Sequence, residues 1–208
     1  REFGLKPLYD KRLLAELLRL SLWSMLHAFI SVAPWFLFFV AIERLGEAQL
    51  AVSNIIRSVS TVFFVIVNSF AATTGALVSN LIGAGERRLL FPLCRKIVKL
   101  GYAIGFPLIV LAACFHQQIA GLYTDSTRLI EMSAVPFIVM LFNYVFALPG
   151  YVYINAVTGT GKTRTAFLFQ LTTIAVYLAY LYLLSRYAGV PLAVYLMAEY
   201  LFVILLAI

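Results

Sequence analysis

The stretch LAVSNIIRSVSTVFFVIVNSFAATTGALVSNLI, residues 50–82, decides the fold of this chain. It contains one charged side chain, Arg57, and otherwise consists of apolar and small polar residues. A helix that crosses a membrane needs about 20 mainly apolar residues in a row to cover about 30 Å of hydrocarbon. The segment is therefore long enough to span a bilayer, and it predicts an integral membrane protein.

Five further apolar segments follow the same pattern, and short charged connectors separate them. Hydrophobic residues make up 63% of the 208-residue chain and charged residues 12%, with a mean hydropathy of +0.96, which leaves too little polar surface for a water-soluble domain. Helices are expected, because a helix satisfies its own backbone in lipid and a barrel would show alternating residues. We predict an all-α membrane protein whose residues 1–208 form one six-helix transmembrane lobe. The predicted spans are 17–42, 50–82, 91–120, 132–151, 165–184 and 190–208.

Positive charge predicts the orientation of these spans. Twelve of the 16 Lys and Arg residues fall at one end of the predicted bundle, three fall at the other end, and Arg57 lies within a span. Both termini are therefore expected in the cytoplasm. The expected location of the protein is the inner membrane of a bacterial cell, and membrane lipid is an expected partner. The +7 net charge reflects this bias, so nucleic acid is not an expected partner. The twelve are Arg1, Lys6, Lys11, Arg12, Arg19, Arg87, Arg88, Arg95, Lys96, Lys99, Lys162 and Arg164; the three are Arg44, Arg128 and Arg186.

Catalytic and cofactor-binding patterns are not evident in the sequence. The stretch AVTGTGKT, residues 156–163, approaches a phosphate-binding loop but has Ala156 where the pattern requires glycine, and membrane helices flank it. We interpret it as a tight cytoplasmic turn. Cys94 and Cys114 would lie about 30 Å apart on one helix, too far for a disulfide. We expect no enzyme and no cofactor, and the sequence leaves metal binding open.

A polar stripe on residues 50–82 is the first candidate for a transport pathway. Its members recur at alternating steps of four and three, which keeps them on one helical face. The stripe could line a cavity, or it could pack closely against another helix through small residues and hydrogen bonds. Arg57 at its edge favours a cavity, although its side chain could also extend to the outer interface. The stripe comprises Asn54, Ser58, Thr61, Val65, Asn68, Ala72, Gly75 and Ser79.

Two ionisable residues are expected near the middle of the membrane, where a charge costs at least ~2.5–3.5 kcal/mol. Glu199 in the last span has Tyr195 on the same face; it could take and release a proton, or stay protonated and bond to a neighbouring helix. His27, seven residues before Pro34, could act in a proton relay, contact a substrate, or form an interhelical hydrogen bond.

Later spans add residues suited to an aromatic, weakly polar pocket that would accept flat, cationic or amphipathic molecules. In span 91–120, the pair Gly101 and Gly105 predicts close contact with another helix. The pocket candidates are Asn143, Tyr144, Gln170, Tyr177 and Tyr180.

Four connector motifs occur in a characteristic order. They are WFLFFVAIERLGEAQLAVSNI (35–55), ALVSNLIGAGE (76–86), LYTDSTRLIE (122–131) and NAVTGTGKTRTA (155–166). In this order and spacing the chain resembles the multidrug and toxic compound extrusion (MATE) transporters, over nearly its whole length. That family combines two six-helix lobes into twelve helices, and the WFLFF stretch resembles the C-terminal lobe.

The resemblance implies an antiporter that exports organic, often cationic compounds in exchange for Na⁺ or H⁺, with the other six-helix lobe, absent from this sequence, as a partner. The chain departs from many members, which carry an acidic residue in the first helix of this lobe where His27 stands here. Alternatives are a flippase of the same superfamily that moves a lipid-linked sugar, a membrane-embedded enzyme, and a non-transporting assembly subunit. The expected pathway residues are His27, Asn54, Arg57, Thr61, Asn68, Asn143, Gln170, Tyr177, Tyr195 and Glu199.

Overall fold

A computed structural model describes residues 10–187 and 189–207. Within these residues the chain forms seven α-helices and one short 3₁₀ helix, without a strand, which confirms the prediction of an all-α protein. The elements are α1 (Lys11–Glu43), α2 (Glu47–Gly83), η1 (Arg87–Leu89), α3 (Leu90–Cys114), α4 (His116–Gly121), α5 (Thr127–Gly159), α6 (Thr163–Ser185) and α7 (Leu192–Ala207).

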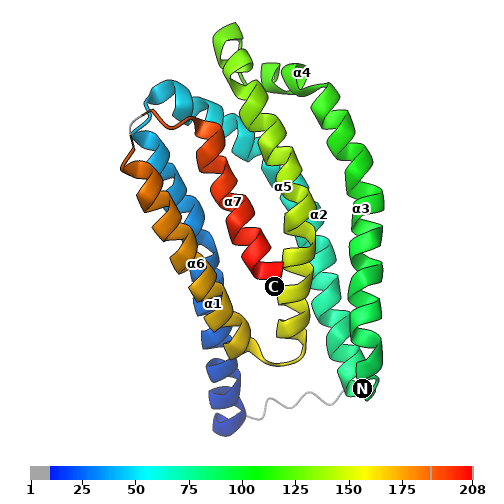
Figure 1. Ribbon diagram of the computed structural model, residues 1–208. Helices are drawn as coiled ribbons and strands as arrows, with labels where there is room; N and C mark the ends of the chain where they lie inside the picture. Colours follow the sequence, from blue (N-terminus) through cyan, green and yellow to red (C-terminus); the bar gives the residue numbers. More distant parts are fainter. Residues whose placement is uncertain (1–9, 188, 208) are drawn as a thin grey trace, which may run out of the picture.

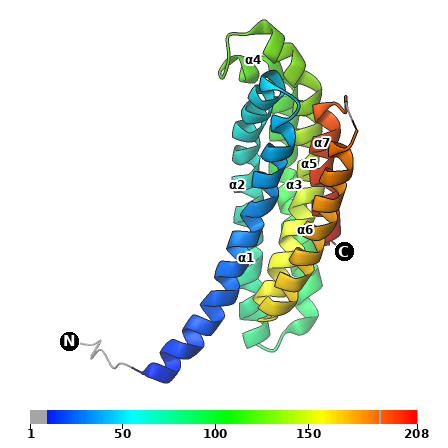
Figure 2. The same cartoon turned by 90° about the vertical axis from the view of Figure 1, so that its left-hand side faces the viewer.

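The long helices lie side by side in one elongated bundle (Figure 1). The connections from α2 to α3 and from α5 to α6 lie at one end of the bundle, and the turns that begin α2 and α7 lie at the other end (Figure 1). The first turns of α1 extend away from the remaining helices (Figure 2). Successive helices therefore run in opposite directions, as expected for a chain that crosses a membrane repeatedly.

Membrane-length helices account for most of the bundle. Among the described residues, four helical segments are long and apolar enough to cross a bilayer: Glu47–Gly83, Arg87–Cys114, Thr127–Gly159 and Thr163–Ser185. Two shorter apolar segments are Pro34–Glu43, the end of α1, and Leu192–Ala207, which is α7. Length and composition thus define a multi-pass membrane protein.

Helix α5 is central to the packing. It contacts α2, α3 and α7 extensively and also touches α4 and α6. One cluster of buried apolar residues joins α5 to α1, α6 and α7, and a second joins α5 to α2 and α3. The two clusters share α5 as a common wall, so this helix positions α2, α6 and α7 around the site described below, and α1 packs on α6 and α2.

Helix α1 begins at Lys11, before the predicted span 17–42, and helix ends differ from the predicted spans in two further places. The predicted span 91–120 is interrupted at Phe115, where α3 ends and the short α4 begins. There the ring Nδ1 of His116 lies 2.9 Å from the carbonyl oxygen of Ala113, and polar residues follow, so the chain leaves the axis of α3. Helix α5 extends beyond the predicted 132–151 at both ends, from Thr127 to Gly159.

Glycines bring α5 close to its neighbours. A Cβ atom added to Gly101 would lie 2.6 Å from Cδ2 of Leu148, and one added to Gly105 would overlap the ring of Tyr144. The Tyr144 hydroxyl donates a hydrogen bond of 2.9 Å to the Gly101 carbonyl oxygen. The predicted close contact at Gly101 and Gly105 is thereby confirmed, and its partner is α5.

Candidate functional site

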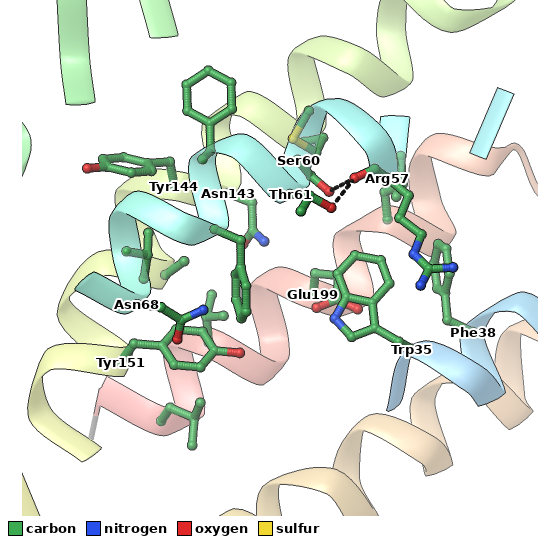
Figure 3. Close-up of a pocket in the computed structure, with 18 of the residues that line it drawn as sticks. Trp35, Phe38, Arg57, Ser60, Thr61, Asn68, Asn143, Tyr144, Tyr151 and Glu199 are labelled. Carbon is green, nitrogen blue, oxygen red and sulfur yellow. Dashed lines mark hydrogen bonds between the residues drawn. The ribbon is translucent and has the colours of Figure 1, made fainter. Parts of the chain in front are cut away.

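A cavity of about 520 Å³ lies between α1, α2, α5, α6 and α7 (Figure 3). Aromatic and apolar side chains form most of its wall, and a small number of polar groups are set among them. Its charged lining residues are Arg57 and Glu199. A concave site of this size, with few polar groups in an apolar wall, is typical of small-molecule binding.

Glu199 lies on α7 and lines the cavity, and a side chain of α6 binds its carboxyl group. The hydroxyl of Tyr177 donates a hydrogen bond of 2.9 Å to Oε1 of Glu199. The Tyr177 side chain is fully buried and packs edge-on against Phe202, with 5.8 Å between ring centroids. One carboxyl oxygen is therefore fixed by the protein, and the carboxyl group remains part of the cavity wall.

Arg57 lies on α2 and lines the same cavity. Its guanidinium carbon lies 5.1 Å from the ring centroid of Phe39, a cation–π arrangement. The hydroxyls of Ser60 and Thr61 each donate a 2.9 Å hydrogen bond to the Arg57 carbonyl oxygen (Figure 3). Within the described residues Arg57 forms no ion pair, so an aromatic ring rather than a carboxylate holds its charge in place.

Aromatic rings from three helices also line the cavity. Trp35 comes from α1 and Tyr151 from α5 (Figure 3). Phe64 comes from α2. The rings of Phe64 and Tyr151 meet edge to face, with centroids 5.1 Å apart and an interplanar angle of 88°. Such rings offer stacking surfaces and electron-rich faces to a flat or cationic ligand.

Amide side chains supply neutral hydrogen-bonding groups. Asn143 is half-buried in the wall, and its Oδ1 is buried without a hydrogen-bond partner among the described residues. Asn68 is exposed on α2, whereas Asn155 donates its Nδ2 to the Tyr151 carbonyl oxygen at 2.9 Å. Because a buried polar atom normally has a partner, the Asn143 oxygen is a natural contact for a bound molecule.

The structure places the expected pathway residues in several locations. Tyr177 lies behind the wall as the partner of Glu199, and Tyr195 is buried in the apolar cluster rather than in the lining. Asn54 lines a separate hollow of about 310 Å³ beside Ser58 and Tyr123. The side chain of His27 lies outside the described residues. Those that line the cavity are Arg57, Thr61, Asn68, Asn143, Gln170 and Glu199.

Most of the polar stripe of α2 is exposed, and two of its members, Thr61 and Asn68, also line the cavity. Asn54, Thr61 and Asn68 are exposed, while Val52, Val59 and other apolar residues of α2 are buried on the opposite face. Several stripe hydroxyls bond to the carbonyl four residues earlier in the same helix, as Ser58 does to Asn54 at 2.9 Å. These hydroxyl groups therefore find their hydrogen-bond partners within α2 rather than on a neighbouring helix. Ser79 is an exception, because its hydroxyl also donates a hydrogen bond of 2.9 Å to the Gly159 carbonyl oxygen of α5.

Sequence reasoning missed part of the wall, notably Trp35, Ser53, Tyr151 and Asn155. A usable signal was present on α5, where lining residues recur at steps of three and four and so share one face. That signal was hard to separate from ordinary core packing, because the face also carries Ala147 and Ile154. The lining residues of α5 are Met140, Asn143, Tyr144, Ala147, Tyr151, Ile154 and Asn155.

The apolar helices define a multi-pass membrane protein with a cavity among its helices. The MatE family model matches residues 24–183, well over half of the chain, so this chain belongs to the MatE family of membrane transporters. No curated protein and no solved structure matches the chain. Family membership agrees with the resemblance that the four connector motifs indicate.

Proposed function

We propose that this chain is the C-terminal lobe of a secondary active transporter that exports organic, often cationic compounds in exchange for Na⁺ or H⁺. The observation that carries the proposal is the cavity in which Glu199, held by Tyr177, lies among aromatic side chains. Membership of a transporter family supports the same function.

The chemistry of the cavity suits exchange of cations. A carboxylate in an apolar wall attracts a cation strongly, because little water screens the charge. Aromatic faces such as those of Trp35 and Tyr151 add cation–π and stacking contacts to an organic cation. When Glu199 binds a proton or Na⁺, its charge is neutralised and the organic cation loses its main electrostatic partner. Entry of the coupling ion would therefore release the exported compound.

A second six-helix lobe would complete the pathway. The exposed polar stripe of α2 supports this, since groups such as Asn68 and Thr61 are costly against lipid but suit a water-filled space between two lobes. The lobes would rock about the site and open it to each side in turn.

The bundle would lie in a bacterial inner membrane with both termini in the cytoplasm. The described residues near the connections from α2 to α3 and from α5 to α6 include Arg87, Arg88 and Lys162, and the opposite end carries Arg44 and Arg186. Labelling of single cysteines at positions 162 and 186 with an impermeant maleimide tests this orientation. Labelling of position 162 in intact cells would contradict it.

Transport by the full-length protein in proteoliposomes tests the function. Efflux of a fluorescent organic cation should require an inward Na⁺ or proton gradient, and Glu199→Gln should reduce the gradient-driven rate about tenfold or more, by removing the exchangeable charge. Glu131→Gln is the matched control, because Glu131 is exposed in the first turns of α5 and does not line the cavity. Unchanged efflux in Glu199→Gln would refute the role of this carboxyl.

A further inference from the structure

Three cations stand together on the outer face of α3. Arg95, Lys96 and Lys99 are exposed, whereas Cys94 and Ile97 between them are buried against the bundle. Residues three and four apart are neighbours on a helix surface, so Lys99 lies next to both Arg95 and Lys96, and their like charges repel one another. We propose that this group, the α3 triad, is a binding site for the phosphate headgroup of an anionic membrane lipid.

The depth of Lys99 calls for an anionic partner. Counted back from Cys114, where α3 ends, the about 20 residues that cross the hydrocarbon reach Arg95. Lys99 is one turn farther in, where an unpaired charge is costly. Within the described residues no carboxylate forms an ion pair with any member of the triad. The Lys99 side chain can extend back toward the interface, and a phosphate at the level of Arg95 and Lys96 would then contact all three cations.

Apolar residues continue the same face of α3 beyond the triad. Ala103, Phe106 and Val110 follow Lys99 at steps of four, three and four, and all three are exposed. Phe106 is 57% exposed and Val110 is 48% exposed. An acyl chain lying along these residues would keep its phosphate at the triad. A lipid therefore matches both parts of this face, whereas a free phosphate ion matches only the cations.

The orientation of the chain in the membrane does not by itself account for the triad. The bias of positive charge toward one side of a membrane places cations in and next to the connections between spans, as with Lys162 and Arg164 around the start of α6. Lys99 is instead nine residues into α3, about 14 Å from the start of that helix at 1.5 Å per residue. Attraction between such a cluster and anionic lipid gives this position a physical reason.

The triad is separate from the cavity described above. Helix α3 packs mainly on α2 and α5 and forms one edge of the bundle (Figure 1). No member of the triad lines the cavity of about 520 Å³ or the smaller hollow beside Asn54. Lipid binding at α3 therefore does not depend on which compound the protein moves, and the inference does not rest on the proposed function.

Native mass spectrometry of the purified full-length protein tests the site. Delipidated protein is titrated with dioleoyl phosphatidylglycerol, which is anionic, or with dioleoyl phosphatidylcholine, which has the same acyl chains and no net charge. The fraction of protein that carries one lipid gives an apparent dissociation constant for each. We expect phosphatidylglycerol to bind about tenfold more tightly, because its net charge is attracted by the three cations.

Substitution of Lys99 locates the site. Lys99→Gln should weaken phosphatidylglycerol binding about fivefold, as for the loss of one cation near a membrane surface, and should leave phosphatidylcholine binding unchanged. Lys99→Arg keeps the charge and should keep the preference. Lys162→Gln is the matched control, because Lys162 is also exposed near the same end of the bundle but lies away from α3. It should bind phosphatidylglycerol as the unchanged protein does.

Four results would overturn the site. Phosphatidylglycerol could bind no more tightly than phosphatidylcholine, or its preference could survive the triple change Arg95→Gln, Lys96→Gln and Lys99→Gln. An equal weakening in Lys162→Gln would identify general surface charge as the cause. Displacement of phosphatidylglycerol by inorganic phosphate at constant ionic strength would identify a free anion as the occupant. Failure of the proposed function looks different, because export would be absent while lipid binding and its dependence on Lys99 remained.

Discussion

At the scale of single residues, Tyr177 determines how Glu199 meets the cavity. The carboxyl group stands at the end of the flexible Glu199 side chain on α7. The hydroxyl of Tyr177, on α6, fixes one of its oxygens through a hydrogen bond of 2.9 Å. Because Tyr177 is fully buried and packed against Phe202, it cannot follow the carboxyl group if that group turns away. Orientation of the carboxyl group therefore comes from α6, although the charge belongs to α7.

Replacement of Tyr177 by phenylalanine tests this dependence. The variant keeps the ring and its packing but removes the hydrogen bond, so we expect slower gradient-driven export and a loss of about 1–2 kcal/mol of stability, or about 2–8 °C in the midpoint of thermal unfolding. Tyr180→Phe, one turn away on α6 and half-buried outside the lining, is the control. Equal export rates and equal unfolding midpoints in the two variants would show that the Tyr177 hydroxyl does not position Glu199.

At the scale of helices, α2 and α5, which both line the cavity, come into close backbone contact. The two backbones approach at Gly75 and Gly159, where a Cβ atom added to Gly159 would lie 3.1 Å from the Cα of Gly75. Ser79 reinforces the contact through its 2.9 Å hydrogen bond to the Gly159 carbonyl oxygen. Gly159 belongs to the stretch that resembles a phosphate-binding loop, and in the structure it ends α5 at a close helix contact.

Gly159→Ala should force these helices apart. Overpacking of this kind costs about 1–3 kcal/mol, so we expect a lower midpoint of thermal unfolding and reduced export. Gly83→Ala is the matched control on α2, because nothing lies within 4 Å of a Cβ atom added there. A Gly159→Ala protein as stable as Gly83→Ala would show that the two backbones are not in close contact.

The helices were predictable because long apolar runs leave few alternatives in lipid, and residues 50–82 lie within α2 as observed. Their ends were less predictable. Hydropathy marks where a chain is buried in lipid, whereas a helix continues until its hydrogen-bonded turns stop. Thus α5 runs on to Gly159, eight residues past the predicted end at 151, and the break at Phe115 interrupts a run that hydropathy alone joins into one span.

The candidate site was partly predictable for a related reason. Arg57 and Glu199 were identifiable from their cost in lipid, and both line the cavity. Trp35 and Tyr151 were not, because an aromatic residue in an apolar helix looks the same whether it faces a cavity, a core or lipid. Tyr195 shows the converse, since it shares a helical face with Glu199 in sequence but is buried in the apolar cluster.

At the scale of the whole molecule, five helices contribute to one cavity, and α5 separates it from the α3 side of the bundle. The exposed stripe on α2 continues the polar surface beyond the cavity toward the proposed second lobe. Family membership, the exposed stripe and the two cavity charges therefore support a single pathway, in which the compound binds between α1, α2 and the α5–α7 helices.

Protection from labelling tests that central claim most directly. Asn68 lines the cavity, while Ser69 is exposed next to it on α2 and is not a lining residue. In a full-length protein otherwise free of cysteine, single cysteines at these two positions are labelled with a maleimide, with and without a saturating concentration of an exported compound. We predict that the compound slows labelling at position 68 several-fold and leaves position 69 unchanged. Equal rates at position 68 with and without the compound would contradict binding in this cavity.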